Sequence, residues 1–250
     1  MRILLLNPNT SQSITDILVA AAVPAAAHGT QIVPATAPRG VPYISSRAEA
    51  QIAGAVALEM LAERHGTYDA AIIAAFGDPG LFAARELFDV PVVGMSEAAM
   101  LTACMLGKRF GIVTFAAAME AWYRDCVEQH GLGPRCAGIR CLDGAFKSID
   151  GVQGEKEAAL VELANKAVSL DGAEVVILAG APLAGLAAKV ADRIPVPLVD
   201  QAAASVKQAE ALVALGPRKA TAGGFRRPSA KSSSGLSNRL AARIAHEDRQ

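Results

Sequence analysis

Two turns rich in glycine and proline carry the clearest signs of ligand chemistry in this sequence. The first, at 72–80, reads Ile-Ile-Ala-Ala-Phe-Gly-Asp-Pro-Gly, and the second, at 177–185, reads Ile-Leu-Ala-Gly-Ala-Pro-Leu-Ala-Gly. In each, a run of β-forming residues gives way to small residues before a helix, so backbone N–H groups should point outward where the strand ends. Open α/β sheets bind ligands at such ends. The two turns are therefore predicted to form a ligand site, with backbone donors around Phe76, Gly77, Asp78, Gly180 and Ala181.

Polar residues at other strand ends extend this predicted site. Asn7 and Asn9 follow the first strand-like run, and Thr114 ends a run at the matching place in the second half of the chain. Each side chain can hydrogen-bond a ligand or instead stabilise its own loop or helix cap. The candidate ligand-binding residues are Asn7, Asn9, Thr10, Tyr43, Ser45, Ala75, Phe76, Gly77, Thr114, Phe115, Gly180, Ala181 and Pro182.

Asp78 is the acidic residue of the first turn and a candidate base. It stands directly before Pro79, and an Asp-Pro pair at the start of a helix is typical of an N-cap followed by the first helical residue. The structural role is the preferred interpretation of Asp78.

The cysteines and histidines show no metal-binding pattern. Cys104, Cys126, Cys136 and Cys141 form no C-x-x-C pair, and the four histidines lack ligand spacing. The prediction is free thiols and no bound metal.

An alternation of strands and helices must position the two turns. Strands are expected at 3–6, within 33–46, and at 70–75, 90–93, 110–114, 136–142, 174–179 and 196–199. Helices are expected from the Thr10–Ser11 pair to about 27, and at 48–64, 78–87, 97–106, 119–130, 155–169, 184–194 and 201–214. Such an alternation predicts parallel sheets with right-handed crossovers.

The chain also repeats itself. Asp69 aligns with Glu174, Ile72 with Ile177, and 90–93 with 196–199 after a one-residue slip. We therefore expect an α/β fold of two similar lobes, each a parallel sheet flanked by helices, related by a pseudo-two-fold axis with a cleft between them. The first lobe is assigned to 1–97 plus 200–222, the second to 98–199, and a basic tail to 223–250, solvated and with one short helix. A tail that contacts another subunit or straps the cleft is the alternative.

The composition argues against several classes of partner. The chain of 250 residues has a formal net charge of zero, which gives no electrostatic argument for nucleic acid or anionic membrane. No apolar run approaches the roughly 18 residues of a membrane helix, and the first residues do not form a signal-peptide pattern. A cytoplasmic protein with a small-molecule substrate is predicted, and the alanine-rich helices are compatible with a homo-oligomer.

Several motifs together resemble one family, the hydantoin and allantoin racemases of the aspartate/glutamate racemase superfamily. The resemblance covers about residues 1–230. Its motifs are the opening loop at 7–11, Asn-Pro-Asn-Thr-Ser, and the signature at 76–86, Phe-Gly-Asp-Pro-Gly-Leu-x-x-Ala-Arg-Glu; the segments at 91–94, 97–100, 110–114 and 171–174 also fit.

This resemblance implies a cofactor-independent isomerase that inverts a carbon next to a carbonyl in a hydantoin-type ring. In the family, one cysteine from each lobe works as acid or base on opposite faces of that carbon, which explains the duplication. Here the two family cysteine positions are Ala75 and Gly180. The resemblance thus implies the binding site with its usual thiol pair replaced.

Two other functions remain open on the sequence. A hydrolase or lyase, including a decarboxylase, could use the same cleft with water or one lobe performing the proton transfer, since the superfamily includes one-cysteine decarboxylases. A non-catalytic small-ligand binder is the second alternative, suggested by the missing thiols.

Overall fold

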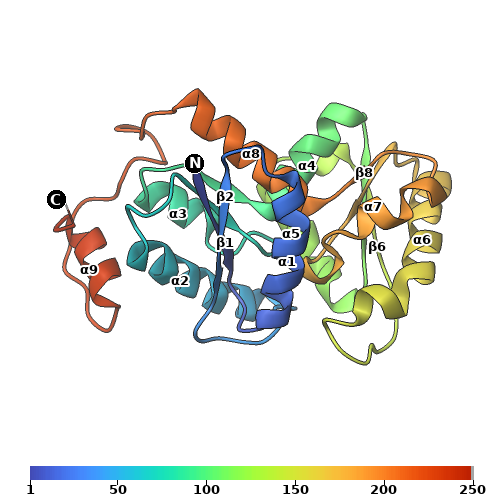
Figure 1. Ribbon diagram of the computed structural model, residues 1–250, viewed down its shortest axis with the longest axis horizontal. Coiled ribbons are helices and arrows are strands. Elements are labelled where there is room, and N and C mark those ends of the chain that lie inside the picture. The colour runs from blue at the N-terminus through green and yellow to red at the C-terminus, as the bar shows by residue number, and fades with distance from the viewer. Residues whose placement is uncertain (249–250) are drawn as a thin grey trace.

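Two four-stranded parallel sheets form the framework of the molecule (Figure 1). The computed structural model describes residues 1–248. The first sheet has the order β2-β1-β3-β4, with strands Arg2–Asn7 (β1), Gln31–Thr36 (β2), Ala70–Ile73 (β3) and Val92–Gly94 (β4). The second has the order β6-β5-β7-β8, with strands Phe110–Thr114 (β5), Cys136–Cys141 (β6), Val175–Leu178 (β7) and Leu198–Val199 (β8). The matching order confirms the two similar α/β lobes expected from the repeat.

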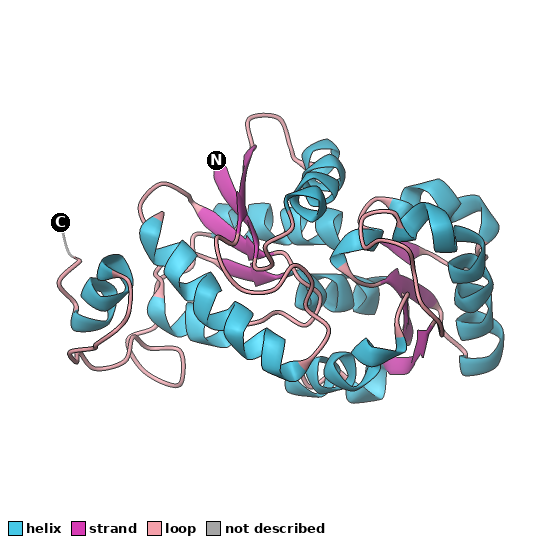
Figure 2. Ribbon diagram, turned by 90° about the horizontal axis from the view of Figure 1, so that it is seen from below, coloured by secondary structure: helices cyan, strands magenta, loops and turns pink. Residues whose placement is uncertain are grey.

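Helices cover the faces of both sheets (Figures 1 and 2). They are Gln12–Ala25 (α1), Arg47–Glu63 (α2), Leu81–Leu87 (α3), Met95–Leu106 (α4), Glu120–Gln129 (α5), Val152–Asp171 (α6), Leu186–Val190 (α7), Gln201–Leu215 (α8) and Asn238–Ala245 (α9). Short 3-10 turns add Ala117–Met119 (η1), Gly133–Arg135 (η2), Ala181–Leu183 (η3) and Ala191–Arg193 (η4). Within residues 1–248, none of the helices has the length and hydropathy to cross a membrane.

Strand β1 shows why the first sheet is buried on both faces. Ile3 and Leu5 pack into one hydrophobic cluster, whereas Leu4 and Leu6 pack into another. Side chains alternate across a strand, so a continuous apolar run must fill two cores at once. The first of these clusters continues through α1, α4 and α8 into the second sheet. One apolar core therefore joins the two sheets.

Several predicted boundaries were wrong where proline or glycine changes the local geometry. The strands predicted at 90–93 and 196–199 begin later, at Val92 and Leu198, although the carbonyls of Pro91 and Pro197 still pair with the neighbouring strands. The helix predicted at 184–194 is divided into α7 and η4 after the turn η3. The helix predicted at 155–169 is longer and spans Val152–Asp171. By contrast, the helix predicted at 201–214 agrees with α8, which packs against β3 and β4 of the first sheet as expected.

The basic tail is not simply solvated. Its one helix, α9, packs against α2, with Leu240 and Arg243 buried at 4% and 3% exposure. The contact brings the C-terminal end of the chain onto the outer side of the first lobe (Figure 1). The lobe limits 1–97 with 200–222, 98–199 and 223–250 remain a prediction.

Candidate active site between the two sheets

The two predicted turns meet at a small cavity between the sheets. Its volume is about 20 Å³, which is room for about one water molecule. The lining residues are Asn9, Ile14, Tyr43, Ile44, Ala75, Phe76, Met119, Trp122, Tyr123, Gly180, Ala181 and Pro182. The strands β3 and β7 occupy equivalent places in the two sheets. Residues of the turn after each strand line this one cavity.

The first turn is held in an unusual backbone shape. Gly77, Asp78 and Gly80 have positive φ angles of 109°, 48° and 80°. A Cβ atom at Gly77 would stand 2.2 Å from the Trp122 ring, and one at Gly80 would stand 2.9 Å from Gly54 of α2. These two glycines therefore allow the turn to fit between α2 and α5.

Asp78 has a different structural role from the one predicted. The helix after the turn begins at Leu81 rather than at Pro79, with Gly80 before it. The Asp78 carboxylate instead accepts hydrogen bonds from the backbone N–H groups of Ser96 (2.9 Å) and Glu97 (2.8 Å) at the start of α4. Asp78 thus caps the next helix and is absent from the lining of the small cavity.

The second turn is built around Gly180. Its φ is 109° and its ψ is 135°, a combination that side chains disfavour. The Gln201 amide brackets its backbone, since Oε1 accepts from the Gly180 N–H at 3.0 Å and Nε2 donates to the Gly180 carbonyl. A Cβ atom at Gly180 would stand 2.9 Å from the Phe115 ring and 3.4 Å from the Tyr123 hydroxyl.

Gly180→Ala is expected to lower the free energy of unfolding by about 1–3 kcal/mol, because it adds backbone strain and a contact with Phe115. Ala75→Ser is the matched control at the other turn and should change stability by less, since Ala75 lies on the small cavity. Urea unfolding of both variants measures the difference. Equal effects would contradict the special geometry of Gly180.

Most backbone donors predicted for the ligand already have acceptors. The N–H of Gly77 donates to Ser96 Oγ (3.1 Å), that of Asp78 to the Ala75 carbonyl (3.0 Å), and that of Gly180 to Gln201. For these three N–H groups the prediction was wrong, because Ser96 at the start of α4, the Ala75 carbonyl in the same turn and Gln201 at the start of α8 accept from them. In residues 1–248, the N–H groups of Phe76 and Ala181 have no such acceptor.

The predicted polar side chains divide into structural residues and cavity residues. Asn7 donates to Asn9, Thr15 and the Ser11 carbonyl, and is completely buried. Four other predicted residues do not line the cavity. The Thr114 hydroxyl donates to the Ala179 carbonyl, and the Ser45 hydroxyl donates to Glu49. The Thr10 backbone N–H donates to the Val41 carbonyl, and the Phe115 ring packs behind Gly180.

Asn9 and Tyr43 are the predicted polar side chains that reach the cavity. Asn9 uses its Oδ1 to accept from Asn7 and from the Ser11 N–H. Its Nδ2 has no acceptor within the part of the chain that the structure describes, and so is left as a donor for a ligand.

Two phenols supply further hydrogen-bonding groups. The hydroxyls of Tyr43 and Tyr123 donate to Met119 Sδ at 2.9 and 3.3 Å. Burial is the main cause that raises the pKa of both phenols, with negative neighbours such as Glu49 adding to the effect at Tyr43. Both tyrosines therefore stay protonated near neutral pH and act as donors rather than bases.

Sequence reasoning missed Met119 and Trp122 of the cavity lining, whereas Tyr123 beside them was a polar candidate. Met119, Trp122 and Tyr123 come from η1 and α5, at a distance from both motifs in the chain. Their i, i+3 and i+4 spacing places them on one helix face, but the same spacing is typical of ordinary core packing. Only the contact with Phe76 and Gly77 distinguishes them.

A polar cluster lies behind the first turn. The His130 ring nitrogens Nε2 and Nδ1 each lie 3.4 Å from a carboxylate oxygen, of Asp78 and Glu97 respectively. Burial opposes a charge on His130, but the interactions with Asp78, Cys126 and Glu97 raise its pKa to about 11. Burial likewise opposes ionisation of Glu97, but His130 and Arg85 lower its pKa to about 2. The cluster is therefore an imidazolium between two carboxylates.

The residue types of this cluster are also those of metal sites and of sites with a nucleophilic cysteine. Asp78, Cys126 and His130 offer ligand atoms within 4.8 Å of one another, the set that a metal ion or a thiol nucleophile would use. Metal binding or base catalysis needs a free ring nitrogen on histidine, whereas both His130 nitrogens face carboxylates. Burial also raises the pKa of Cys126, whose Sγ lies 3.2 Å from Ser96 Oγ. The arrangement fits a structural ion pair better than either alternative.

Comparison with known proteins places this chain in a family. The family model described as Asp/Glu/Hydantoin racemase matches residues 3–209. A hydantoin racemase of Paenarthrobacter aurescens is 34% identical over 233 residues, which is 92% of this chain and 99% of that protein. An allantoin racemase structure from Klebsiella pneumoniae is 35% identical with a TM-score of 0.90, covering 96% of this chain and 98% of that one.

A more distant comparison extends the fold. An arylmalonate decarboxylase structure has a TM-score of 0.60 at 17% identity, covering 87% of this chain and 94% of that one, and shares the fold alone. The match of the family model to residues 3–209 and the identities of 34% and 35% show that the chain belongs to the Asp/Glu/hydantoin racemase family.

Proposed function

We propose that the chain is an isomerase of the hydantoin and allantoin racemase type that needs no cofactor. Its substrate is a small cyclic amide, imide or carboxylate held between the two turns, with inversion at a carbon next to a carbonyl. The observation that carries this proposal is the cavity in which Ala75–Phe76 and Gly180–Pro182 converge from equivalent strands. The named relatives, hydantoin and allantoin racemases, support the substrate class.

The proposal includes replacement of the usual pair of thiols. The family cysteine positions are Ala75 and Gly180, neither of which can move a proton. Support comes from the packing around Gly180. The Phe115 ring and the Tyr123 hydroxyl fill the space that a side chain at this position would need. Cys126 does not line the cavity, and neither does Asp78, the weak candidate base.

In this proposal the hydroxyls of Tyr43 and Tyr123 turn from Met119 Sδ, a weak acceptor, and donate to the substrate carbonyl. Neutral donors directed at an oxygen that gains negative charge make the adjacent C–H more acidic and stabilise the resulting enolate. The proton passes to a water molecule in the cavity and is returned from water, because no side chain of the lining is an ionised base. Asn9 Nδ2 and the N–H groups of Phe76 and Ala181 complete the set of donors. The aromatic walls, with Phe76 and Tyr123 ring centroids 4.7 Å apart, leave room for about one water molecule beside the reacting carbon.

Substrate entry requires an opening beside Trp122. A cavity of about 20 Å³ cannot hold a five-membered ring. Trp122 also lines a larger groove of about 520 Å³ formed by α2, the first turn and α5. We therefore infer that displacement of Trp122 from Gly77 connects the groove with the inner site.

The direct test uses one enantiomer of allantoin or of a 5-substituted hydantoin in D₂O. Loss of optical rotation together with deuterium at the ring carbon, followed by NMR, is the expected result. A panel of such rings that shows neither exchange nor loss of rotation would contradict the isomerase proposal.

Tyr123→Phe should reduce kcat of that reaction by about 10²–10³-fold, the usual effect of removing one donor to a developing oxyanion. Tyr68→Phe is the matched control, because the Tyr68 hydroxyl is buried elsewhere and donates to the Leu61 carbonyl. Steady-state kinetics distinguishes the two variants. A similar small effect of both would remove Tyr123 from the mechanism.

A lyase such as a decarboxylase is a second candidate, and the asymmetry of the turns favours it. A hydroxyl stands close to the Gly180 position, whereas Ala75 presents a methyl group. Delivery of a proton to one face suffices for a lyase, but not for racemisation. A change in substrate mass without inversion would identify this reaction, and ligand-induced stabilisation without turnover would instead indicate a binder.

A further inference from the structure

A second cavity lies where the C-terminal tail folds onto the first lobe. Its volume is about 540 Å³, and it shares no lining residue with the small cavity between the sheets. The walls come from the end of α2, the loop before β4, the segment after α8, and α9 with the residues that follow it. A cavity of this size can hold a small organic molecule.

Positive charge predominates in this cavity. Lys219, Arg226, Arg227 and Arg243 line it, against the carboxylates of Asp89 and Asp248. The local balance is thus two positive charges, in a chain whose formal net charge is zero. Such an imbalance in a partly enclosed space attracts anions.

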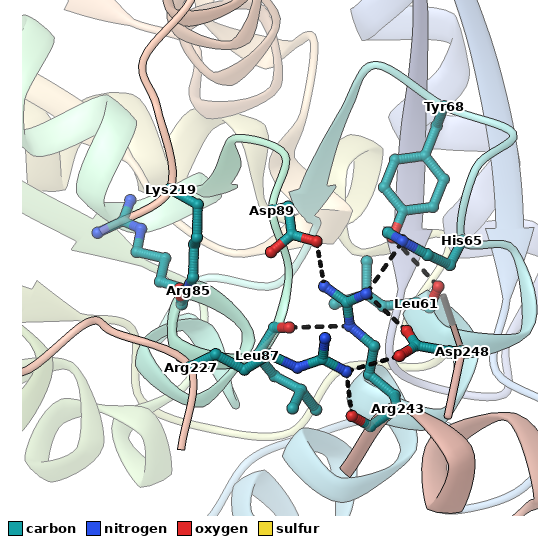
Figure 3. A network of polar contacts seen from close by, with 10 residues as sticks. All are labelled: Leu61, His65, Tyr68, Arg85, Leu87, Asp89, Lys219, Arg227, Arg243 and Asp248. Atoms are coloured by element: carbon teal, nitrogen blue, oxygen red, sulfur yellow. Dashed lines mark hydrogen bonds and ion pairs between the residues drawn. The ribbon is translucent and has the colours of Figure 1, made fainter. Parts of the chain in front are cut away.

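Arg243 is already fully engaged, as Figure 3 shows. Its Nε donates to the Leu87 carbonyl at 2.9 Å, and its two terminal nitrogens donate to Asp89 and Asp248 at 2.6 Å each. Both carboxylates are therefore used to neutralise this one buried guanidinium, with Arg227 sharing Asp248.

The other cations have donors without acceptors. The Lys219 ammonium donates to the Arg85 carbonyl but to no carboxylate among residues 1–248, and the exposed Arg226 guanidinium makes no hydrogen bond to protein there. Arg227 Nε is buried without a partner. Charged donors of this kind are satisfied by carboxylate or phosphate oxygens.

His65 adds a further orphaned donor. Its Nε2 lies 3.2 Å from the Arg243 guanidinium, which can only donate, so Nε2 must accept and the proton resides on Nδ1. Nδ1 is buried and has no partner. Burial and the charge of Arg243 lower the pKa of His65, so the ring is neutral at pH 7. The buried unpaired groups here, His65 Nδ1 and Arg227 Nε, are both donors, which the oxygens of an anion would satisfy.

We propose that this cavity binds a multiply charged oxyanion, either a phosphate group or a polycarboxylate, through Lys219, Arg226 and Arg227. Small movements of Arg227 and His65 would turn their buried N–H groups toward the bound oxygens. The site is independent of the proposed isomerase reaction.

The test measures the thermal stability of the full chain with inorganic phosphate, pyrophosphate or citrate, against sodium chloride at equal ionic strength. At a tenfold excess over Kd, the bound anion should raise Tm by roughly 3–6 °C. A response to the two phosphates alone identifies a phosphate site, and a response to citrate alone identifies a polycarboxylate site. The absence of a response beyond that of chloride would overturn the proposal.

Variants establish where the anion binds. Lys219→Gln and Arg226→Gln should each weaken binding about tenfold or more, measured by calorimetry. Arg239→Gln is the control, since it removes the same charge from the exposed side of α9 outside the cavity. Equal weakening in all three would show diffuse charge attraction and refute the site.

His65 provides a readout that does not depend on stability. An anion bound beside the ring should raise the pKa of His65, shifting the imidazole titration in NMR to higher pH. The shift should be lost in Arg226→Gln. An unchanged titration at saturating anion would contradict the proposed location.

Discussion

Replacing His130 with glutamine is expected to lower the free energy of unfolding by about 3–5 kcal/mol near pH 6, the usual cost of removing one partner from a buried ion pair. Glutamine keeps a planar polar side chain but supplies no charge to Asp78 and Glu97, which lie 3.4 Å from the imidazole nitrogens. The His130 side chain is 6% exposed, so water does not compensate for the loss. Urea unfolding measures the effect.

The stability lost in His130→Gln should decrease as the pH rises, because only charged His130 stabilises the ion pair. The pKa of His130 is about 11 in the folded chain and about 6.5 when unfolded. Its stabilisation is therefore complete below about pH 6.5 and disappears as the pH rises through 11. The parent protein should lose up to about 1.4 kcal/mol per pH unit from this group in that range.

Glu97 sets the lower end of the pH range in which the ion pair with His130 stabilises the fold. Its folded pKa of about 2 lies below the ordinary value of 4.5, so its contribution is present above pH 4.5 and is lost as the pH falls toward 2. The difference in stability between the parent and His130→Gln should thus be largest between pH 4.5 and 6.5.

His28→Gln is the matched control, because His28 is exposed. It should leave both the stability and its pH dependence almost unchanged. A constant difference between the parent and His130→Gln from pH 6 to 10 would mean that His130 is neutral in the folded protein, and would contradict the ion-pair assignment.

Arg243→Met should have a comparable effect on the tail, lowering the free energy of unfolding of this region by about 3–5 kcal/mol. The guanidinium is buried, binds Asp89 and Asp248, and stacks over Phe88 with its Cζ 5.4 Å from the ring centroid. Methionine retains much of the apolar stem but leaves both carboxylates and the Leu87 carbonyl without their donor. Hydrogen exchange along α9 is the appropriate measurement, since α9 can detach locally.

Arg239→Met on the same helix is the control, because its side chain is exposed and makes no ion pair within residues 1–248. Fast exchange in α9 is expected only for Arg243→Met. Equal protection of α9 in both variants would show that apolar contacts such as that of Leu240 hold the helix by themselves.

The two turns illustrate how far local sequence reaches. Apolar runs that end in glycine and proline identify β3 and β7 and the strand ends proposed to bind a ligand, because these features depend only on neighbours in the chain. The same local rules assigned Asp78 to its own helix. Three positive φ angles within the turn direct its carboxylate to α4, an outcome fixed by packing against α2 and Trp122.

The roles of His130 and Arg243, in contrast, could not be predicted from local sequence. His130 carries no metal-ligand or catalytic spacing in the sequence, and Arg243 is one of many basic residues in a tail interpreted as solvated. Their roles depend on Asp78, Glu97 and Asp89, residues brought near them only by the fold. No local pattern encodes a partner that is more than a hundred residues away, as Asp89 is from Arg243.

By itself, the sequence determined the parallel α/β repeat and the two matched sheets, and it predicted the location of the candidate site, since hydrophobic periodicity and turn chemistry are local properties. The tertiary structure decided which groups of the turns remain free for a ligand. Gly77, Asp78 and Gly180 use their N–H groups internally, whereas Tyr43 and Tyr123 reach the cavity from different elements. The reason is physical: a buried polar group bonds to whatever packing brings within about 3 Å, and that neighbour is set by the whole fold.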